Sequence, residues 1–165
     1  MIPFSEQFFE TGSIDQINFD DPISRNHVES LSVHLPRFAR PPLSSESLVV
    51  HPDLKYKGYM DCVTICYDES NFKSKAKLVL IDWKTSQKAK ETLNATFDNP
   101  LQIAAYIGAF NHDDRYPVQV NEGMIVVVYN DGRPAKLLPI SRNQLEKYWK
   151  AWLQRLNLYS SYRVD

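Results

Sequence analysis

The sequence contains few cysteines, no long hydrophobic run and no strong excess of charge of either sign. Its two cysteines, Cys62 and Cys66, exclude a disulfide scaffold and a cysteine-based zinc module, so we expect buried, reduced thiols. No run of about 18 apolar residues is present, which predicts that nothing spans a membrane. Because the formal net charge is -1, any polyanion would have to be bound by a local basic patch.

The N-terminal residues also lack the features of a targeting segment. Residues 1–21 are acidic and contain no arginine, unlike a transit peptide. They also have no basic region followed by an apolar stretch, unlike a secretory signal. We therefore expect no targeting sequence in this chain.

The rest of the composition is typical of a globular protein. The 165 residues are 43% hydrophobic and 24% charged, which is enough for a core and for one domain of roughly 100–200 residues. Residues 1–44 show little periodicity and are predicted to be a lead-in, partly helical or irregular, with one helix candidate at residues 24–35. Residues 45–165 are predicted to form the core, and a two-domain enzyme is excluded.

Periodicity in the core region predicts a mixed α/β domain. Stretches rich in β-branched and aromatic residues predict strands, the second and third of which form an antiparallel pair joined by a loop at 68–75. A buried helix is predicted to begin at an Asn99 cap with Pro100 in its first turn, and a last helix at the Ser141–Gln144 capping box. The predicted strands are 45–51, 57–67, 76–86, 123–132 and 135–141. The first core helix, of about three turns, lies within 96–114 and the last spans about 141–159, which gives the order βββαββα.

The third predicted strand carries an acid and an amine on one face. Asp82 and Lys84 are two residues apart, so both point to one side of the strand, and Trp83 points to the other. Folding the preceding hairpin about its loop centre places Asp61 opposite Asp82. A lone Asp-x-Lys on a strand is more often a surface ion pair, but the second carboxylate makes a catalytic site equally plausible.

Two carboxylates this close repel each other unless a cation or a shared proton offsets the repulsion. Oxygen ligands without a histidine or cysteine cluster favour a hard ion, Mg²⁺ or Mn²⁺. Such an ion lowers the pKa of a bound water, and Lys84 could orient that water or stabilise the charge of the transition state. These groups are the ones needed to hydrolyse a phosphodiester.

Gln102 and Tyr106 are one turn apart on the next helix, whose start should approach the strand ends. There, Gln102 could hold a ligand or a phosphate. Without the two acids, ordinary packing and a surface amide would be the preferred explanation of both residues. Lys88 and Lys90 follow the third strand and could supply the local basic patch, the alternative being a solvated face.

Three segments in order resemble the successive motifs of RecB-type nucleases of the PD-(D/E)xK superfamily. They are Gly58–Asp61, Ile81–Ser86 and Gln102–Tyr106, and the resemblance covers roughly residues 27–159. The longer stretches IDWKTS, TFDNPLQIAAYIGAFNHD and GMIVVVYNDGRPA resemble animal mitochondrial members of that family more closely still. The resemblance implies a restriction-endonuclease-like core with a mixed central β-sheet flanked by helices. It also implies a metal-dependent exonuclease on single-stranded DNA, acting in the mitochondrial matrix in mitochondrial DNA maintenance.

The resemblance also implies a role for each matched residue. Asp61 and Asp82 would bind Mg²⁺ or Mn²⁺, the backbone carbonyl of Trp83 would complete the protein ligands, and Lys84 would be the catalytic lysine. Thr85 or Ser86 would contact phosphate. The expected DNA-binding or supporting residues are Thr85, Ser86, Gln102, Tyr106, Lys88, Lys90 and Glu46, the last at the acidic position of the strand before the first motif.

The chain departs from the family pattern upstream of the core. RecB-type relatives place a metal-binding histidine on an upstream helix, and neither His27 nor His34 lies in a matching context. We therefore expect that ligand and an enclosing helical part to be missing, as in a truncated isoform, an incomplete gene model or a fragment. The alternatives to a monomeric exonuclease are a catalytically impaired nucleic-acid-binding fragment and another RecB-type nuclease. Digestion polarity and DNA or RNA preference are not encoded in these motifs.

Overall fold

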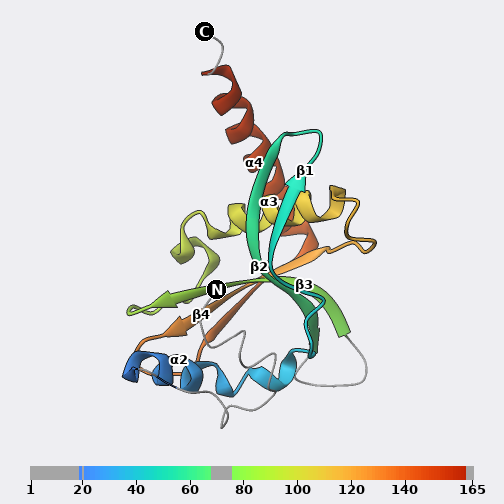
Figure 1. Cartoon of the computed structure of the whole chain (residues 1–165). Helices are drawn as coiled ribbons and strands as arrows, with labels where there is room; N and C mark the ends of the chain where they lie inside the picture. Colours follow the sequence, from blue (N-terminus) through green and yellow to red (C-terminus); the bar gives the residue numbers. More distant parts are fainter. Residues whose placement is uncertain (1–18, 20, 68–75, 163–165) are drawn as a thin grey trace.

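The computed structural model describes residues 19, 21–67 and 76–162. Five strands form one sheet, with helices on both of its faces (Figure 1). The strands are β1 (Ser44–His51), β2 (Tyr56–Tyr67), β3 (Ala76–Ser86), β4 (Glu122–Tyr129) and β5 (Lys136–Ile140). The helices are α2 (Pro22–Ser32), α3 (Asn99–His112) and α4 (Arg142–Ser161), with short 3-10 helices η2 (Leu35–Arg37) and η3 (Leu93–Thr96).

The sheet is mixed, in the order β1-β2-β3-β4-β5. β3 and β4 are parallel and are joined by the crossover through α3, whereas every other neighbouring pair is antiparallel. The predicted order βββαββα and the α/β fold class are confirmed. This arrangement agrees with the restriction-endonuclease-like core that the sequence motifs imply.

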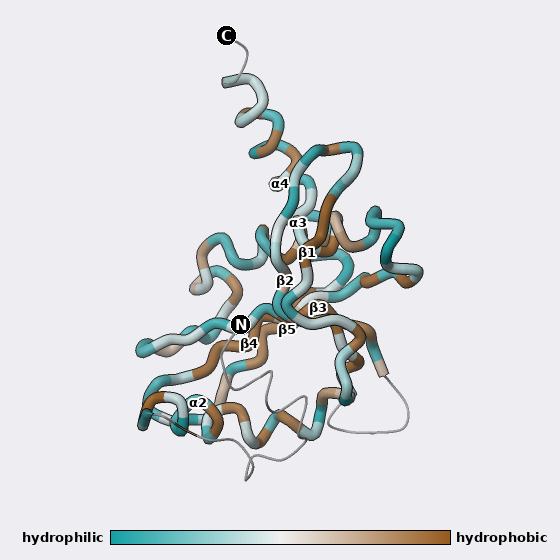
Figure 2. Tube along the Cα trace, viewed as in Figure 1, coloured by the Kyte–Doolittle hydropathy of each residue, from teal (hydrophilic) through white to brown (hydrophobic). Residues whose placement is uncertain are grey.

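Two hydrophobic cores lie on opposite faces of the sheet. α2 covers one face, where Val28 and Leu31 pack with Ile81 and Trp83. α3 covers the other, where Ile103 packs with side chains of β2, β3 and β4, and α4 packs outside α3 (Figure 1). Every residue of β4 from Gly123 to Tyr129 is buried, and Figure 2 shows the hydrophobic residues of β4 in the middle of the fold. The apolar sequence of β4 is continuous because helices pack against both faces of the sheet.

The register between β2 and β3 is the one predicted from the hairpin. Cys62 lies opposite Ile81, and the ladder continues without a slip to Tyr67 opposite Ala76. Cys62 and Cys66 lie on the same face, buried and reduced, as expected. The predicted loop 68–75 falls outside the described residues.

The start of α3 differs by one residue from the prediction. Asp98, not Asn99, is the N-cap, and its side chain makes no capping hydrogen bond. Its carboxylate instead forms an ion pair with Arg155 of α4, 2.8 Å away, and therefore ties the two helices together. The Ser141 capping box of α4 is confirmed, with the side chains of Ser141 and Gln144 each bonding the other's backbone N–H.

Candidate active site

Asp82 and Lys84 lie near the C-terminal end of β3, on the sheet face that α3 covers. The neighbouring Ile81 and Trp83 point into the core beneath α2, so the predicted division of the two faces is correct. Asp82 is 2% exposed, and its Oδ2 lies 2.8 Å from the Nζ of Lys84. The pair is therefore a largely buried ion pair and not the surface pair that the simpler interpretation predicted.

Asp61 reaches the same end of β3 from β2. Its Oδ2 accepts a hydrogen bond of 2.8 Å from the backbone N–H of Trp83. The regular β2–β3 ladder ends at the neighbouring pair, Cys62 and Ile81. Beyond it, the N–H of Trp83 donates to the Asp61 side chain and not to a backbone carbonyl of β2. The N–H and C=O of one strand residue point to the same edge, so the Trp83 carbonyl is directed to the Asp61 side as well.

The environment of Asp82 disfavours its charged form. Burial raises its pKa to about 6, the positive charge of Lys84 opposes the rise, and the nearby negative charge of Asp61 adds to it. An acid whose pKa is displaced by burial together with a like charge is typical of functional sites. The carboxylates of Asp61 and Asp82 are therefore close enough for their charges to interact.

Gln102 of α3 links Lys84 to Tyr106. The Nζ of Lys84 donates to Oε1 of Gln102 at 3.2 Å, and Nε2 of Gln102 donates to the hydroxyl of Tyr106 at 2.8 Å. Burial first, and then the charges of Asp82 and Asp61, raise the pKa of Tyr106. The amide that sequence analysis expected at a ligand or phosphate is thus, in this structure, the group that holds the lysine.

Gly58 gives Tyr106 the space to lie against β2. A Cβ at this glycine would lie 2.5 Å from Cε1 of the Tyr106 ring, so any larger residue would displace the ring and with it the partner of Gln102. Gly58 belongs to the first resembling motif, and close approach of α3 to β2 explains why a glycine is needed there.

The remaining predicted residues occupy different positions around this end of the sheet. Glu46 is exposed and lies on β1 at the register position opposite Asp61, with a φ of 42° that interrupts the pairing of β1. Thr85 is exposed and, by strand alternation, belongs to the Trp83 face. The hydroxyl of Ser86 donates to the carbonyl of Lys88 and accepts from its N–H, so it stabilises the turn after β3.

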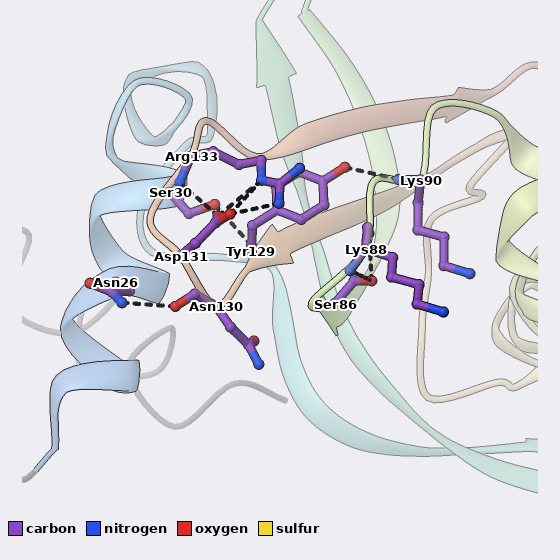
Figure 3. A network of polar contacts seen from close by, with 9 residues as sticks. All are labelled: Asn26, Ser30, Ser86, Lys88, Lys90, Tyr129, Asn130, Asp131 and Arg133. Atoms are coloured by element: carbon purple, nitrogen blue, oxygen red, sulfur yellow. Dashed lines mark hydrogen bonds and ion pairs between the residues drawn. The ribbon is translucent and has the colours of Figure 1, made fainter.

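That turn positions Lys88 and Lys90. The N–H of Lys90 donates to the hydroxyl of Tyr129 at 3.2 Å, and Figure 3 shows both lysine side chains extending in the same direction away from β4. In the same network, Asn26 of α2 donates to the carbonyl of Asn130. The two amines are therefore carried on a segment that is hydrogen-bonded to the end of β4.

The two upstream histidines make hydrogen bonds at the turn between β4 and β5. The Nε2 of His27 is 2.8 Å from Oδ1 of Asn130, and that of His34 is 2.9 Å from the carbonyl oxygen of Ala135. Among residues 19, 21–67 and 76–162, no three histidine, cysteine, aspartate or glutamate side chains gather as a metal cluster. The candidate site therefore offers two carboxylates and a backbone carbonyl.

This donor set fits Mg²⁺ or Mn²⁺. Mg²⁺ in proteins commonly takes one or two carboxylates and fills its other positions with water and substrate phosphate. Within the described part of the chain, Oδ2 of Asp82 is buried and accepts no well-aligned hydrogen bond, although the Lys84 ammonium is close to it. A bound cation would offset both the cost of burying the Asp82 carboxylate and the repulsion from Asp61.

Sequence comparison finds curated relatives that share almost half of the residues aligned. Mitochondrial genome maintenance exonuclease 1 of Xenopus tropicalis is 49% identical over 122 residues, which are 74% of this chain and 33% of the relative. The proteins of the same name from Mus musculus and Homo sapiens are 47% and 46% identical over 115 residues, or 70% of this chain and 32% and 31% of theirs. The matched stretch is homologous to these exonucleases.

The chain spans about a third of the length of these exonucleases. The names of these relatives agree with the resemblance of the longer sequence stretches to animal mitochondrial nucleases. No family model matches the chain. In the ranges the structure describes, no helix is long and apolar enough to cross a membrane.

Proposed function

We propose that this chain carries the catalytic core of a metal-dependent exonuclease that hydrolyses phosphodiester bonds of single-stranded DNA. The observation that supports it is the convergence of Asp61, Asp82 and Lys84 at the end of one hairpin. The relatives' names support the exonuclease activity and a mitochondrial setting, and we extend both to this chain, with the matrix as the site of action in mitochondrial DNA maintenance. The preference for single strands follows from the resemblance of the motifs.

In this proposal Asp61, Asp82 and the carbonyl of Trp83 hold the cation. When bound, Mg²⁺ or Mn²⁺ would polarise a phosphoryl oxygen and make hydroxide available near neutral pH. Lys84 keeps its ammonium beside Asp82, where it can orient the attacking water or stabilise the negative charge that develops on the phosphate. Gln102 fixes that ammonium from the α3 side, and Tyr106 in turn fixes Gln102.

A second candidate function is nucleic-acid binding without cleavage. It is favoured by one observation: the Nε2 atom of each upstream histidine bonds to a group of the β4–β5 turn. If a third protein ligand is required for turnover, a chain of this length would bind the metal and the strand without cutting.

The test is cleavage of an end-labelled single-stranded oligonucleotide by the purified chain with Mn²⁺, beside an EDTA control and the Asp82→Asn variant. We expect loss of label that requires the metal and is absent in the variant. Cleavage that persists in Asp82→Asn would assign the activity to a contaminant. Binding of the oligonucleotide without any cleavage by the wild type would support the second candidate.

A further inference from the structure

Phe97 is an exposed aromatic residue in an unfavourable backbone conformation. It ends η3 with φ 56° and ψ -123°, a region that residues with a Cβ rarely adopt, and it is 82% exposed. Neither burial nor a favourable turn conformation accounts for a large hydrophobic side chain here. Strained, exposed residues of this kind are concentrated at ligand-binding sites.

Lys90 lies against the ring of Phe97. Its ammonium is 4.5 Å from the ring centroid, which is a cation–π contact. The backbone of Lys90 is held by the hydroxyl of Tyr129, and Lys88 extends alongside it (Figure 3). The ammonium of Lys90 therefore contacts the Phe97 ring, and Lys88 adds a second positive charge nearby.

Phe97 lies about one helical turn before Gln102, the α3 residue that contacts Lys84. It directly precedes Asp98, whose carbonyl accepts the N–H of Gln102 at 3.0 Å, and Gln102 accepts a hydrogen bond from Lys84. One turn of helix rises about 5.4 Å. A strand bound with one phosphate at Lys84 and running along the first turn of α3 would bring a neighbouring nucleotide to Phe97.

We propose that Phe97 stacks on a base of the bound single strand, with Lys90 supporting the ring and neutralising phosphate charge. This inference rests on the proposed function, because it takes the strand at Lys84 as its reference. The combination of an exposed ring and flanking amines matches the two elements that single-strand binding uses, base stacking and an electrostatic track. A purely hydrophobic protein partner would be disfavoured by the two amines.

Two oligonucleotides of equal length and charge separate stacking from phosphate contact. One carries normal bases and the other is abasic, and both are titrated by fluorescence anisotropy in EDTA so that neither is cut. We expect Phe97→Leu to raise the Kd for the normal strand by about tenfold and to leave the Kd for the abasic strand unchanged. The reason is that loss of stacking on one base lowers affinity by about this factor. Phe97→Trp should retain wild-type affinity.

A control variant and a stability measurement exclude a merely structural effect. Tyr162 is 85% exposed at the C-terminal end of α4, which leads away from the sheet (Figure 1), and Tyr162→Leu should change neither Kd. Phe97→Gly removes the strain of the positive φ, so the Tm of this variant should not fall. Its affinity for the normal strand should fall. Equal Kd values for the wild type and Phe97→Leu on the normal strand would overturn this inference alone, as would equal losses on both strands. A wild type that binds neither strand would overturn the proposed function itself.

Discussion

Replacing Asp82 by asparagine is expected to abolish cleavage of single-stranded DNA while stabilising the metal-free protein at neutral pH. The carboxylate is 2% exposed, and burial raises its pKa to about 6 from the ordinary 3.8. Asparagine has nearly the same shape and carries no charge. The activity should fall by at least about a hundredfold, because a cation ligand contributes several kcal/mol to transition-state stabilisation.

The stability effect has a defined dependence on pH. Because the folded protein holds the Asp82 proton more tightly than the unfolded chain does, stability falls as the pH rises from about 4 to about 6 and stays reduced above that. The difference of about two pKa units corresponds to about 3 kcal/mol at pH 7 and to almost nothing at pH 4. For a chain of this size, removing that cost should raise Tm by about 5–10 °C.

Thermal unfolding of wild type and Asp82→Asn in EDTA, at pH 4 and at pH 7, measures this effect. The two proteins should unfold at similar temperatures at pH 4 and separate at pH 7. An Asp82→Asn protein that is less stable than the wild type at pH 7 would show that the carboxylate is not destabilised by its environment, and the argument for a cation at this position would lose its support.

Replacing Lys84 by methionine is expected to abolish cleavage and to have the opposite effect on stability. Methionine keeps the aliphatic length but removes the ammonium that lies 2.8 Å from Asp82 and 3.2 Å from Gln102. The buried Asp82 carboxylate then loses its counter-charge, which should destabilise the metal-free protein at pH 7 by about 1–2 kcal/mol. The loss is no larger because the Lys84 side chain is about one-third exposed, so solvent already screens the pair. Turnover should fall by about a hundred- to a thousandfold.

Affinity for the uncut strand distinguishes the roles of the two residues. In EDTA, the Kd of Lys84→Met for a single-stranded oligonucleotide should be within a few fold of the wild-type Kd, because the variant loses only one of several phosphate contacts. Combining it with Asp82→Asn should restore stability at pH 7, since neither charge is then buried alone. Cleavage by Lys84→Met at the wild-type rate would remove the lysine from the catalytic assignment.

The sequence was sufficient to predict the fold class and the register of the β2–β3 hairpin, because both depend on local patterns. Strand alternation places Asp82 and Lys84 on one face, and the register of a hairpin follows from its loop centre, which is why Cys62 lies opposite Ile81 as predicted. The capping box at Ser141 is likewise a short-range signal and is present in the structure.

The features that sequence reasoning missed depend on contacts between distant segments. The Asp98–Arg155 ion pair joins residues far apart in the chain and removes Asp98 from capping its own helix. The bond from the Trp83 N–H to Asp61 requires the β2–β3 ladder to stop at one particular pair. The positive φ of Phe97 has no signal in the identity of the residue, because phenylalanine is not selected for that conformation.

A Mn²⁺ titration of the purified chain measures whether Asp61 and Asp82 form a divalent-cation site. Electron paramagnetic resonance of free Mn²⁺ counts the ions bound by wild type, Asp61→Asn and Asp82→Asn at pH 7. We predict saturable binding to the wild type that each substitution weakens by at least about tenfold. Binding that is absent in the wild type, or equal in all three proteins, would show that these two carboxylates do not form a cation site.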